Sequence, residues 1–323
     1  MDNILVTKDN KGSGSLTLTV LGCGTLGTAI FSGIFASLVN LSASTSQNEE
    51  PPQIPTRFVA CIRPDESPAQ IHKTLDKYNI DLTIHQGENL KGITAADVVI
   101  LACKPQGVTG ILSEPGIKDA LKGKLLISIL AGVPASQIEE ILYGDHNTWL
   151  SLPSDQKCYI VRVMPNTAAI NAESMTVIEQ SVPPLPSSMA SMCTWIFQRV
   201  GKVIHLPSSN LDVSTALCGS GPAFCALMLE ALADGAVAMG LPRAEAQLMA
   251  AQTMRGAAGM VLAGEHPAII RDKVSTPGGC TIGGLLVLEE GRARGTIARS
   301  IREATVVASQ LGQGVKNVNG TRF

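Results

Sequence analysis

Short, almost continuously apolar runs recur along the first two-thirds of the chain and alternate with segments of helical periodicity. The apolar runs predict strands buried on both faces, at residues 16–21, 57–62, 97–102, 125–130, 159–164 and 175–178, with a shorter one at 202–206. The helical segments between them lie at residues 29–41, 68–78, 136–143 and 189–199. Strands that alternate with helices favour an α/β fold with a mostly parallel sheet covered on both faces.

The pattern changes after about residue 206, where the strand signals stop. Residues 212–311 are rich in Ala, Leu, Met and Gly and predict helices over 223–239, 243–263, 281–290 and 296–310. We therefore expect an α/β domain over residues 1–206 and an all-helical domain over 207–323. The apolar faces of these helices are broad, which favours burial against a partner subunit over a monomeric bundle.

Two segments near the N-terminus depart from this pattern. Residues 42–56 are polar and contain three prolines, so we interpret them as a loop insertion. Residues 16–48 carry no charged side chain, which makes a membrane span a formal alternative. Four glycines and the change from strand to helical periodicity within this segment favour a buried strand and helix instead.

Composition narrows the class of protein. The chain has 323 residues, a net charge of −2, 45% hydrophobic residues and 16% charged residues, which is typical of a core-rich globular protein. No basic patch is interleaved with aromatic residues, so nucleic acid is not an expected partner. The eight cysteines form no C-x-x-C pair, which argues against zinc and against a disulfide framework. We see no targeting segment and expect a cytoplasmic protein without a membrane partner.

A glycine-rich fingerprint follows the first predicted strand. Gly22, Gly24 and Gly27, with Thr25 and Leu26 between them, match G-x-G-x-x-G and open the first predicted helix. Glycines at these positions permit a tight turn and let the backbone approach a pyrophosphate at the helix N-terminus. The fingerprint in this context predicts a Rossmann-type dinucleotide-binding domain.

The end of the second predicted strand bears on the choice of dinucleotide. Arg63 follows that strand, and a cation there suits the 2′-phosphate of NADPH. Asp65, two residues on, could instead favour NADH by accepting from the ribose. A third interpretation is that Arg63 is a solvated loop residue. We expect NADPH as the cofactor, with NADH as an alternative.

Three further loops follow predicted strands and should share the carboxyl edge of the sheet with the glycine-rich loop. Lys104 and Pro105 come after the third strand, whose last residue is Ala102. Ala131 and Gly132 follow the fourth strand, and Asn166 follows the fifth. Together they predict a cofactor cleft, in which Asn166 could hydrogen-bond the nicotinamide or a reacting group.

A second glycine-rich loop lies in the helical half, at residues 275–281. Its Pro-Gly-Gly turn allows successive backbone N–H groups to converge just before a helix, which suits a small carboxylate. An ordinary loop between helices is the alternative. The candidate substrate-binding residues are Thr276, Gly278, Gly279, Cys280 and Thr281. His266, which precedes a proline nearby, is interpreted as a loop residue and not as a catalyst.

The chain resembles the pyrroline-5-carboxylate reductase family, and in particular a fungal-type member, over nearly all of its length from residue 18 to residue 312. The resemblance rests on residues 212–224, DVSTALCGSGPAF, and on residues 274–281, VSTPGGCT, with shorter matches between and after them in the family's order. Cys218 and Phe224 stand where the family usually has Ser and Tyr, and Ala168 stands where Pro often follows Pro-Asn-Thr. The extra residues at 145–156 are interpreted as a loop elaboration.

The resemblance implies reduction of L-1-pyrroline-5-carboxylate to L-proline, the last step of proline biosynthesis, with NADPH or NADH. It implies a helical domain that interlocks with its twin in a homodimer, with further assembly into decamers. It also implies a site between the cofactor cleft of one subunit and the 275–281 loop of its partner. Thr281 is the expected catalytic residue, and its hydroxyl would hydrogen-bond the ring nitrogen of the substrate.

Two other functions remain open at this stage. A dehydrogenase of the 3-hydroxy acid type would place a catalytic lysine on a helix of the second domain. Lys273 is the only lysine between His205 and Lys316. A protein that binds a dinucleotide as a sensor, without turnover, would bind NADPH and reduce no imine.

Overall fold

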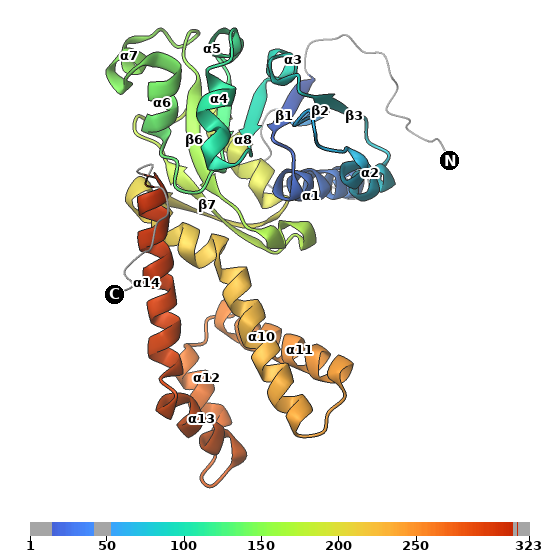
Figure 1. Ribbon diagram of the computed structural model, residues 1–323, viewed down its shortest axis with the longest axis vertical. Helices are drawn as coiled ribbons and strands as arrows, with labels where there is room; N and C mark the ends of the chain where they lie inside the picture. Colours follow the sequence, from blue (N-terminus) through green and yellow to red (C-terminus); the bar gives the residue numbers. More distant parts are fainter. Residues whose placement is uncertain (1–14, 42–52, 313–314, 316–323) are drawn as a thin grey trace.

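The computed structural model describes residues 15–41, 53–312 and 315 of the chain. Its described part is an eight-stranded sheet covered by helices on both faces, followed by a group of helices that extends away from the sheet (Figure 1). This arrangement confirms the predicted fold class, a mostly parallel α/β sheet followed by a helical part.

The sheet has the strand order β3-β2-β1-β4-β5-β6-β7-β8. Strands β1 to β6 pair in parallel, whereas β7 is antiparallel to β6 and parallel to β8. The order reverses between β1 and β4, and such a switch point is where open α/β sheets bind ligands. The strands are β1 Leu16–Leu21, β2 Pro55–Ile62, β3 Leu82–Gln86, β4 Val98–Leu101, β5 Leu125–Ser128, β6 Tyr159–Met164, β7 Ser174–Gln180 and β8 Gly201–Pro207.

The helices that cover the sheet are short except for α1 and α8. They are α1 Thr25–Leu41, α2 Ala69–Leu75, α3 Asn89–Ala95, α4 Val108–Leu112, α5 Ile117–Ala120, α6 Ala135–Tyr143, α7 His146–Ser151 and α8 Ser187–Gln198. Beyond β8 come α9 Leu211–Ser214, α10 Gly221–Ala238, α11 Arg243–Leu262, α12 Pro267–Val274, α13 Cys280–Glu290 and α14 Ala293–Gly312. A π-helical turn over Thr215–Gly219 joins α9 to α10.

Most sequence predictions match these bounds, with some differences. Helix α1 begins at Thr25, four residues before the predicted start, because the glycine-rich fingerprint itself forms its first turn. Strand β3 and helices α3, α4, α5, α7, α9 and α12 had no counterpart in the predictions. Helix α7 lies within residues 145–156, which we interpreted as a loop elaboration. The predicted loop at 42–56 lies mostly outside the described residues, and its last two residues belong to β2.

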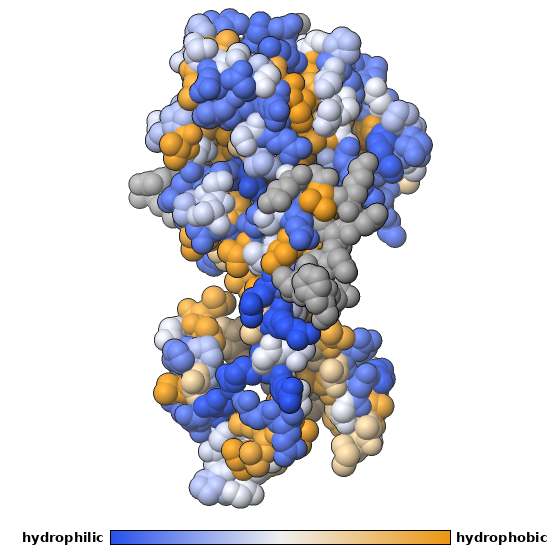
Figure 2. Space-filling view, turned by 60° about the vertical axis from the view of Figure 1, so that its left-hand side comes forward, coloured by the Kyte–Doolittle hydropathy of each residue, from blue (hydrophilic) through white to orange (hydrophobic). Residues whose placement is uncertain are grey.

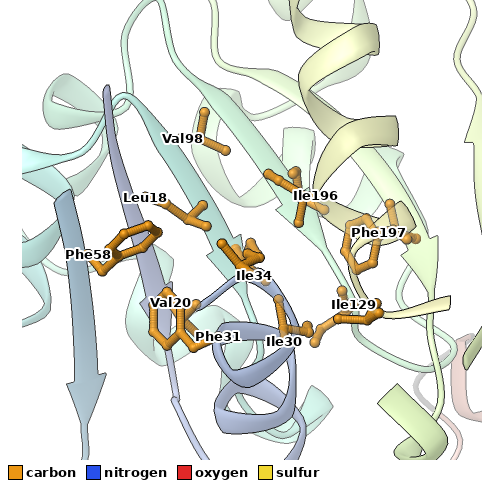
Figure 3. Close-up of a cluster of buried hydrophobic side chains, with 14 of the residues drawn as sticks. Leu18, Val20, Ile30, Phe31, Ile34, Phe58, Val98, Ile129, Ile196 and Phe197 are labelled. Atoms are coloured by element: carbon orange, nitrogen blue, oxygen red, sulfur yellow. The ribbon is translucent and has the colours of Figure 1, made fainter. Parts of the chain in front are cut away.

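Side chains of the strands alternate between two hydrophobic cores, one on each face of the sheet. On one face Leu18 and Val20 of β1 pack with Ile30 and Phe31 of α1 and with Phe197 of α8 (Figure 3). The other core is formed by the alternate strand residues and by α3 to α7. Burial on both faces explains why the strands β1, β4 and β5 are almost continuously apolar.

The helices beyond β8 keep much of their apolar surface exposed. In α10 and α11 only Ala233 and Ala246 are buried, and none of the residues of α12 or α13 is buried. Leu262 is 88% exposed and Met239 is 87% exposed. Hydrophobic patches accordingly lie over the lower, helical half of the molecule in Figure 2. An exposed apolar surface of this extent indicates contact with another molecule.

One stretch in this half is long and apolar enough to cross a bilayer. It covers residues 208–238, and 11% of its most apolar window is buried within the chain. The charge-free N-terminal segment, by contrast, forms β1 and the buried helix α1 as far as it is described.

Helix α14 returns from the far end of the helical group to the sheet (Figure 1). Its last residue, Gly312, lies against Gly132 in the loop after β5. A Cβ atom on Gly312 would lie 2.1 Å from the Gly132 carbonyl oxygen, and one on Gly132 would lie 2.9 Å from the Ala308 carbonyl oxygen. Two glycines therefore permit this close packing of a helix end against a sheet loop.

Candidate functional site

The glycine-rich loop lies at the switch point of the sheet, between the carboxyl ends of β1 and β4. Leu21 at the end of β1 pairs with Leu101 at the end of β4. Gly22, with a φ of +72°, is so close to the next strand's loop that a Cβ atom would lie 2.7 Å from the Cys103 Cα atom. The left-handed backbone and this close approach both require glycine.

The other two glycines of the fingerprint also fit a dinucleotide. A Cβ atom on Gly24 would have open space around it, whereas one on Gly27 would lie 2.8 Å from Val20 Cγ1. Gly27 therefore allows close packing of α1 on β1, and Gly24 leaves room for a ligand. The first N–H groups of a helix have no intrahelical partner, so those of α1, from Thr25 to Gly27, are available to a ligand. The loop thus fits a pyrophosphate.

Three thiols surround this loop, and burial keeps them protonated at neutral pH. Burial is the main cause that raises the pKa of Cys23 to about 12, of Cys61 to about 12 and of Cys103 to about 11. A nucleophilic or metal-binding cysteine requires a thiolate. Burial therefore disfavours the thiolate form of all three cysteines beside the cofactor loop.

The predicted cofactor residues after β4 line the same edge. Ala102 donates its N–H to the Leu21 carbonyl at 2.8 Å, which ties the two strand ends together. Lys104 is exposed, and Pro105 begins a 3₁₀ turn. Arg63, which follows β2, is also exposed, and its Nε lies 3.3 Å from Glu66 Oε2 and 3.8 Å from Asp65 Oδ1. The structure thus places the Arg63 guanidinium at the expected carboxyl edge of the sheet, where it is paired with Asp65 and Glu66.

The loop after β5 is divided between the cleft and the packing of α14. Ala131 is half-buried, but Gly132 is buried beneath the end of α14. We predicted Gly132 as a cofactor contact. Its neighbours show that its missing side chain is needed for helix packing, which sequence reasoning did not anticipate.

Asn166 holds the helical part against the sheet. Its Nδ2 donates to the Cys218 carbonyl at 3.0 Å, and its Oδ1 accepts from the Ala168 N–H at 3.0 Å. The Cys218 carbonyl belongs to the π-helical turn, a feature that occurs often at functional sites. The Asn166 amide thus ties the turn before α10 to the end of β6. Its hydrogen bond to the nicotinamide or a reacting group stays a prediction.

An ion pair with one buried partner lies at the same junction. Arg162 of β6 is buried, and its Nη2 lies 3.6 Å from Oδ1 of the half-buried Asp212 of α9. The sequence alone gave no signal for this pair, because 50 residues separate its partners and Arg162 belongs to no recognisable motif.

The second glycine-rich loop forms a tight turn at the start of α13. Pro277 and Gly278 occupy its centre, Gly278 has a φ of +68°, and the Gly279 N–H donates to the Thr276 carbonyl at 3.0 Å. This is a type II turn, which requires glycine at its third position. We predicted that the Gly279 N–H would hold a carboxylate, but here it closes the turn. The N–H groups of Cys280 and Thr281, in the first turn of α13, have no intrahelical partner.

The two loops do not meet within one chain. The glycine-rich loop lies at the sheet, whereas α13 and the turn before it lie at the far end of the helical group (Figure 1). Thr281 is half-buried and Thr276 is exposed. Helices α10 to α12 precede this second loop in the sequence and α13 follows it, and all four have exposed apolar residues. A site that uses both loops therefore needs a second chain.

Other features of the described residues lie apart from these loops. A cavity of about 690 Å³ is bounded by α6, α7 and the segment after β7, and none of the predicted site residues lines it. No group of three or more His, Cys, Asp or Glu residues in the described part could hold a metal ion.

Comparison with known protein families gives two matches. The family described as pyrroline-5-carboxylate reductase dimerisation matches residues 208–311. The family described as NADP oxidoreductase, coenzyme F420-dependent, matches residues 17–132. The first match covers the helical group and the second covers the glycine-rich loop.

Similar proteins span nearly the whole chain. A pyrroline-5-carboxylate reductase of Lophium arboricola is 60% identical over 97% of this chain and 98% of its own length. One of Neurospora crassa is 51% identical, with the same two coverages. Among solved structures, a pyrroline-5-carboxylate reductase of Coxiella burnetii is 28% identical, covers 92% of this chain and 99% of its own, and has a TM-score of 0.71. A Plasmodium falciparum pyrroline carboxylate reductase, solved with NADP bound, is 24% identical over 93% of this chain and 100% of its own. Its TM-score of 0.73 supports the fold.

Proposed function

The chain belongs to the pyrroline-5-carboxylate reductase family, and we propose that it reduces L-1-pyrroline-5-carboxylate to L-proline with NADPH or NADH. The observation that carries this proposal is that two loops, each at the start of a helix, suit two different anionic groups. One, at Gly22 to Gly27, suits a pyrophosphate, and the other, at Thr276 to Thr281, suits a small carboxylate.

In the proposed site, residues of α13 hold and orient the substrate. We assign the substrate carboxylate to the N–H groups of Cys280 and Thr281, where the helix dipole also favours a negative charge. The Thr281 hydroxyl hydrogen-bonds the ring nitrogen and passes it a proton from water, because threonine is too weak an acid to supply one itself. When bound, the reduced nicotinamide supplies the hydride to C5 of the ring C=N bond.

We propose that the active unit is a homodimer, and that dimers assemble further into decamers. The exposed apolar residues of α10 to α13 and the match of residues 208–311 to a dimerisation family support the dimer. The domain boundary that we propose, between residues 206 and 207, is supported by the end of β8 at Pro207 and the helices that follow. The cytoplasmic location stays a prediction from the sequence.

The activity is tested with the purified full-length chain, racemic pyrroline-5-carboxylate and either reduced nicotinamide cofactor. We expect the absorbance of the reduced cofactor to fall and proline to accumulate in equal amount. Omission of the imine serves as the control. A folded protein that binds NADPH but reduces no imine would contradict the proposal and favour the sensor function.

Replacement of Arg63 tests how the cofactor is recognised. Arg63→Ser should raise the KM for NADPH by about 5- to 20-fold, because a charge-assisted hydrogen bond to a phosphate contributes roughly 1.5–3 kcal/mol, less at an exposed position. The KM for NADH, which lacks the 2′-phosphate, should change much less. Steady-state kinetics with both cofactors measure the difference, and equal effects on both would show that Arg63 does not contact the phosphate.

A further inference from the structure

The loop after β2 is a tight turn that brings Arg63 and Glu66 together. Pro64 and Asp65 form its centre, and the Glu66 N–H donates to the Arg63 carbonyl at 3.1 Å. Proline is favoured at the second position of such turns because its φ is already fixed. Residues at the first and fourth positions lie close together across a turn, so the sequence order itself places a carboxylate beside the guanidinium.

The neighbouring strand fixes this turn from the side. Gln86 at the end of β3 donates from Nε2 to the Pro64 carbonyl at 2.7 Å and to the Glu66 carbonyl at 3.0 Å. The N–H of Gly87, the next residue, donates to the Ile62 carbonyl at 2.9 Å. These hydrogen bonds hold backbone groups on both sides of the turn. The sheet therefore fixes the backbone positions of Arg63 and Glu66.

Glu66 is the closer of two acids that compete for Arg63. Its Oε2 lies 3.3 Å from Arg63 Nε, whereas Asp65 Oδ1 lies 3.8 Å away. The Glu66 side chain is 35% exposed and the Asp65 side chain is 75% exposed, so Glu66 is less screened by solvent. The Nε edge of the guanidinium is therefore occupied by Glu66.

Glu66 also acts on the glycine-rich loop. The pKa of Cys23, which lies between Gly22 and Gly24, is raised mainly by burial, with a smaller contribution from the negative charge of Glu66. The end of β2 lies beside the glycine-rich loop, because the Cys61 carbonyl accepts from the Gly22 and Cys23 N–H groups, each at 2.9 Å. The turn that carries Glu66 follows directly after β2, at the strand end where the adenosine half of a dinucleotide would lie.

We propose that Glu66 sets the preference between NADPH and NADH by holding the Arg63 guanidinium. A 2′-phosphate must compete with Glu66 for Arg63, and it also meets the negative charge of that carboxylate. An unphosphorylated ribose meets neither obstacle, and its hydroxyls can donate to the carboxylate. The inference rests on the proposed function in that it assigns the site to a nicotinamide dinucleotide, and it accounts for how one loop accommodates both cofactors.

Glu66→Gln is the test, because glutamine keeps the shape of the side chain and removes its charge. We expect the KM for NADPH to fall by about 2- to 5-fold, the range that an exposed ion pair allows, and the KM for NADH not to fall. Asp119→Asn is a matched control, since Asp119 Oδ1, in α5 and away from this turn, lies 2.8 Å from a cation, Lys122, at the same spacing of three residues. Its ratio of the two KM values should equal that of the wild type.

A binding measurement separates this inference from the activity. Titration calorimetry with adenosine 2′,5′-bisphosphate should show about 2- to 5-fold tighter binding to Glu66→Gln than to the wild type, with no gain for 5′-AMP. In an Arg63→Ser background the same change should give a smaller gain or none, because the ion pair is already lost. A wild-type ratio in Glu66→Gln, or an equal gain in the Arg63→Ser background, would overturn the inference. Absence of imine reduction in the wild type would overturn the proposed function alone.

Discussion

Thr281→Val is expected to lower kcat/KM for imine reduction by about 10- to 150-fold, with little change in the KM for NADPH. The range follows from a hydrogen bond to a charging group, worth roughly 1.5–3 kcal/mol. Valine has nearly the shape of threonine, so the loss would report on the hydroxyl. The fold should persist, because Thr281 is only half-buried and α13 has no buried residue within the chain.

Two comparisons make this result specific to the hydroxyl. Thr281→Ser keeps the group and should retain most of the activity, whereas Thr281→Ala should behave like Thr281→Val. Steady-state kinetics with the imine and with NADPH, together with thermal unfolding of each variant, provide the measurement. If Thr281→Val reduced the imine at the wild-type rate, the role assigned to Thr281 would be wrong. The proposed activity of the protein would not be affected by that result.

The strands that sequence reasoning predicted well share one physical property. Those in the middle of the sheet, such as β1, β4 and β5, are buried on both faces and therefore almost continuously apolar. Strand β3 was missed because it lies at the edge, next to β2 alone, and none of its residues is buried. An edge strand has no need of the apolar run on which the prediction relied.

The missed helices have a different explanation. Helices α3, α4, α5, α7 and α9 contain four to seven residues, which is too short for a helical period to stand out. Helix α12 begins at Pro267, and the His266 side chain caps it by accepting from the Ala268 N–H at 3.2 Å. The proline was the available signal, because proline is favoured in the first turn of a helix. His266, interpreted as a loop residue, is a helix cap.

For the candidate site, sequence reasoning worked where backbone geometry alone dictates the residue. Gly22 and Gly27 have neighbours that leave no room for a side chain, and Gly24 has the open space that a dinucleotide loop requires. The sequence did not predict how polar groups are used, because the folded backbone decides which hydrogen-bond partners they meet. Asn166 is bonded to a carbonyl 52 residues away, and the Gly279 N–H closes its own turn. The separation of the two loops within one chain has no sequence signal beyond the broad apolar faces of the helices.

This separation leads to the second prediction of large effect, which concerns mixtures of two inactive chains. A site shared between subunits combines the glycine-rich loop of one chain with the α13 loop of the other. Gly24→Asp should abolish cofactor binding, because the space around Gly24 is open and would hold a carboxylate where the pyrophosphate is expected. Thr281→Val should disable the other loop. Each variant alone is expected to have about a tenth of the wild-type activity or less.

Co-expression of the two variants in equal amount is expected to restore about one quarter of the wild-type activity. Random pairing makes half of the dimers hybrid, and each hybrid has one site with both changes and one site with neither. If each site lay within one chain, every site in a hybrid would carry one change and no activity would return. Co-expression of Gly24→Asp with a chain that carries both substitutions is the matched control, because no pairing of these two chains creates an intact site. Recovery in the first mixture and not in the second would show that the 276–281 loop of one subunit shares a site with the cofactor loop of its partner. Activity of the first mixture no higher than the mean of the two parent variants would show that both loops of a site belong to the same chain.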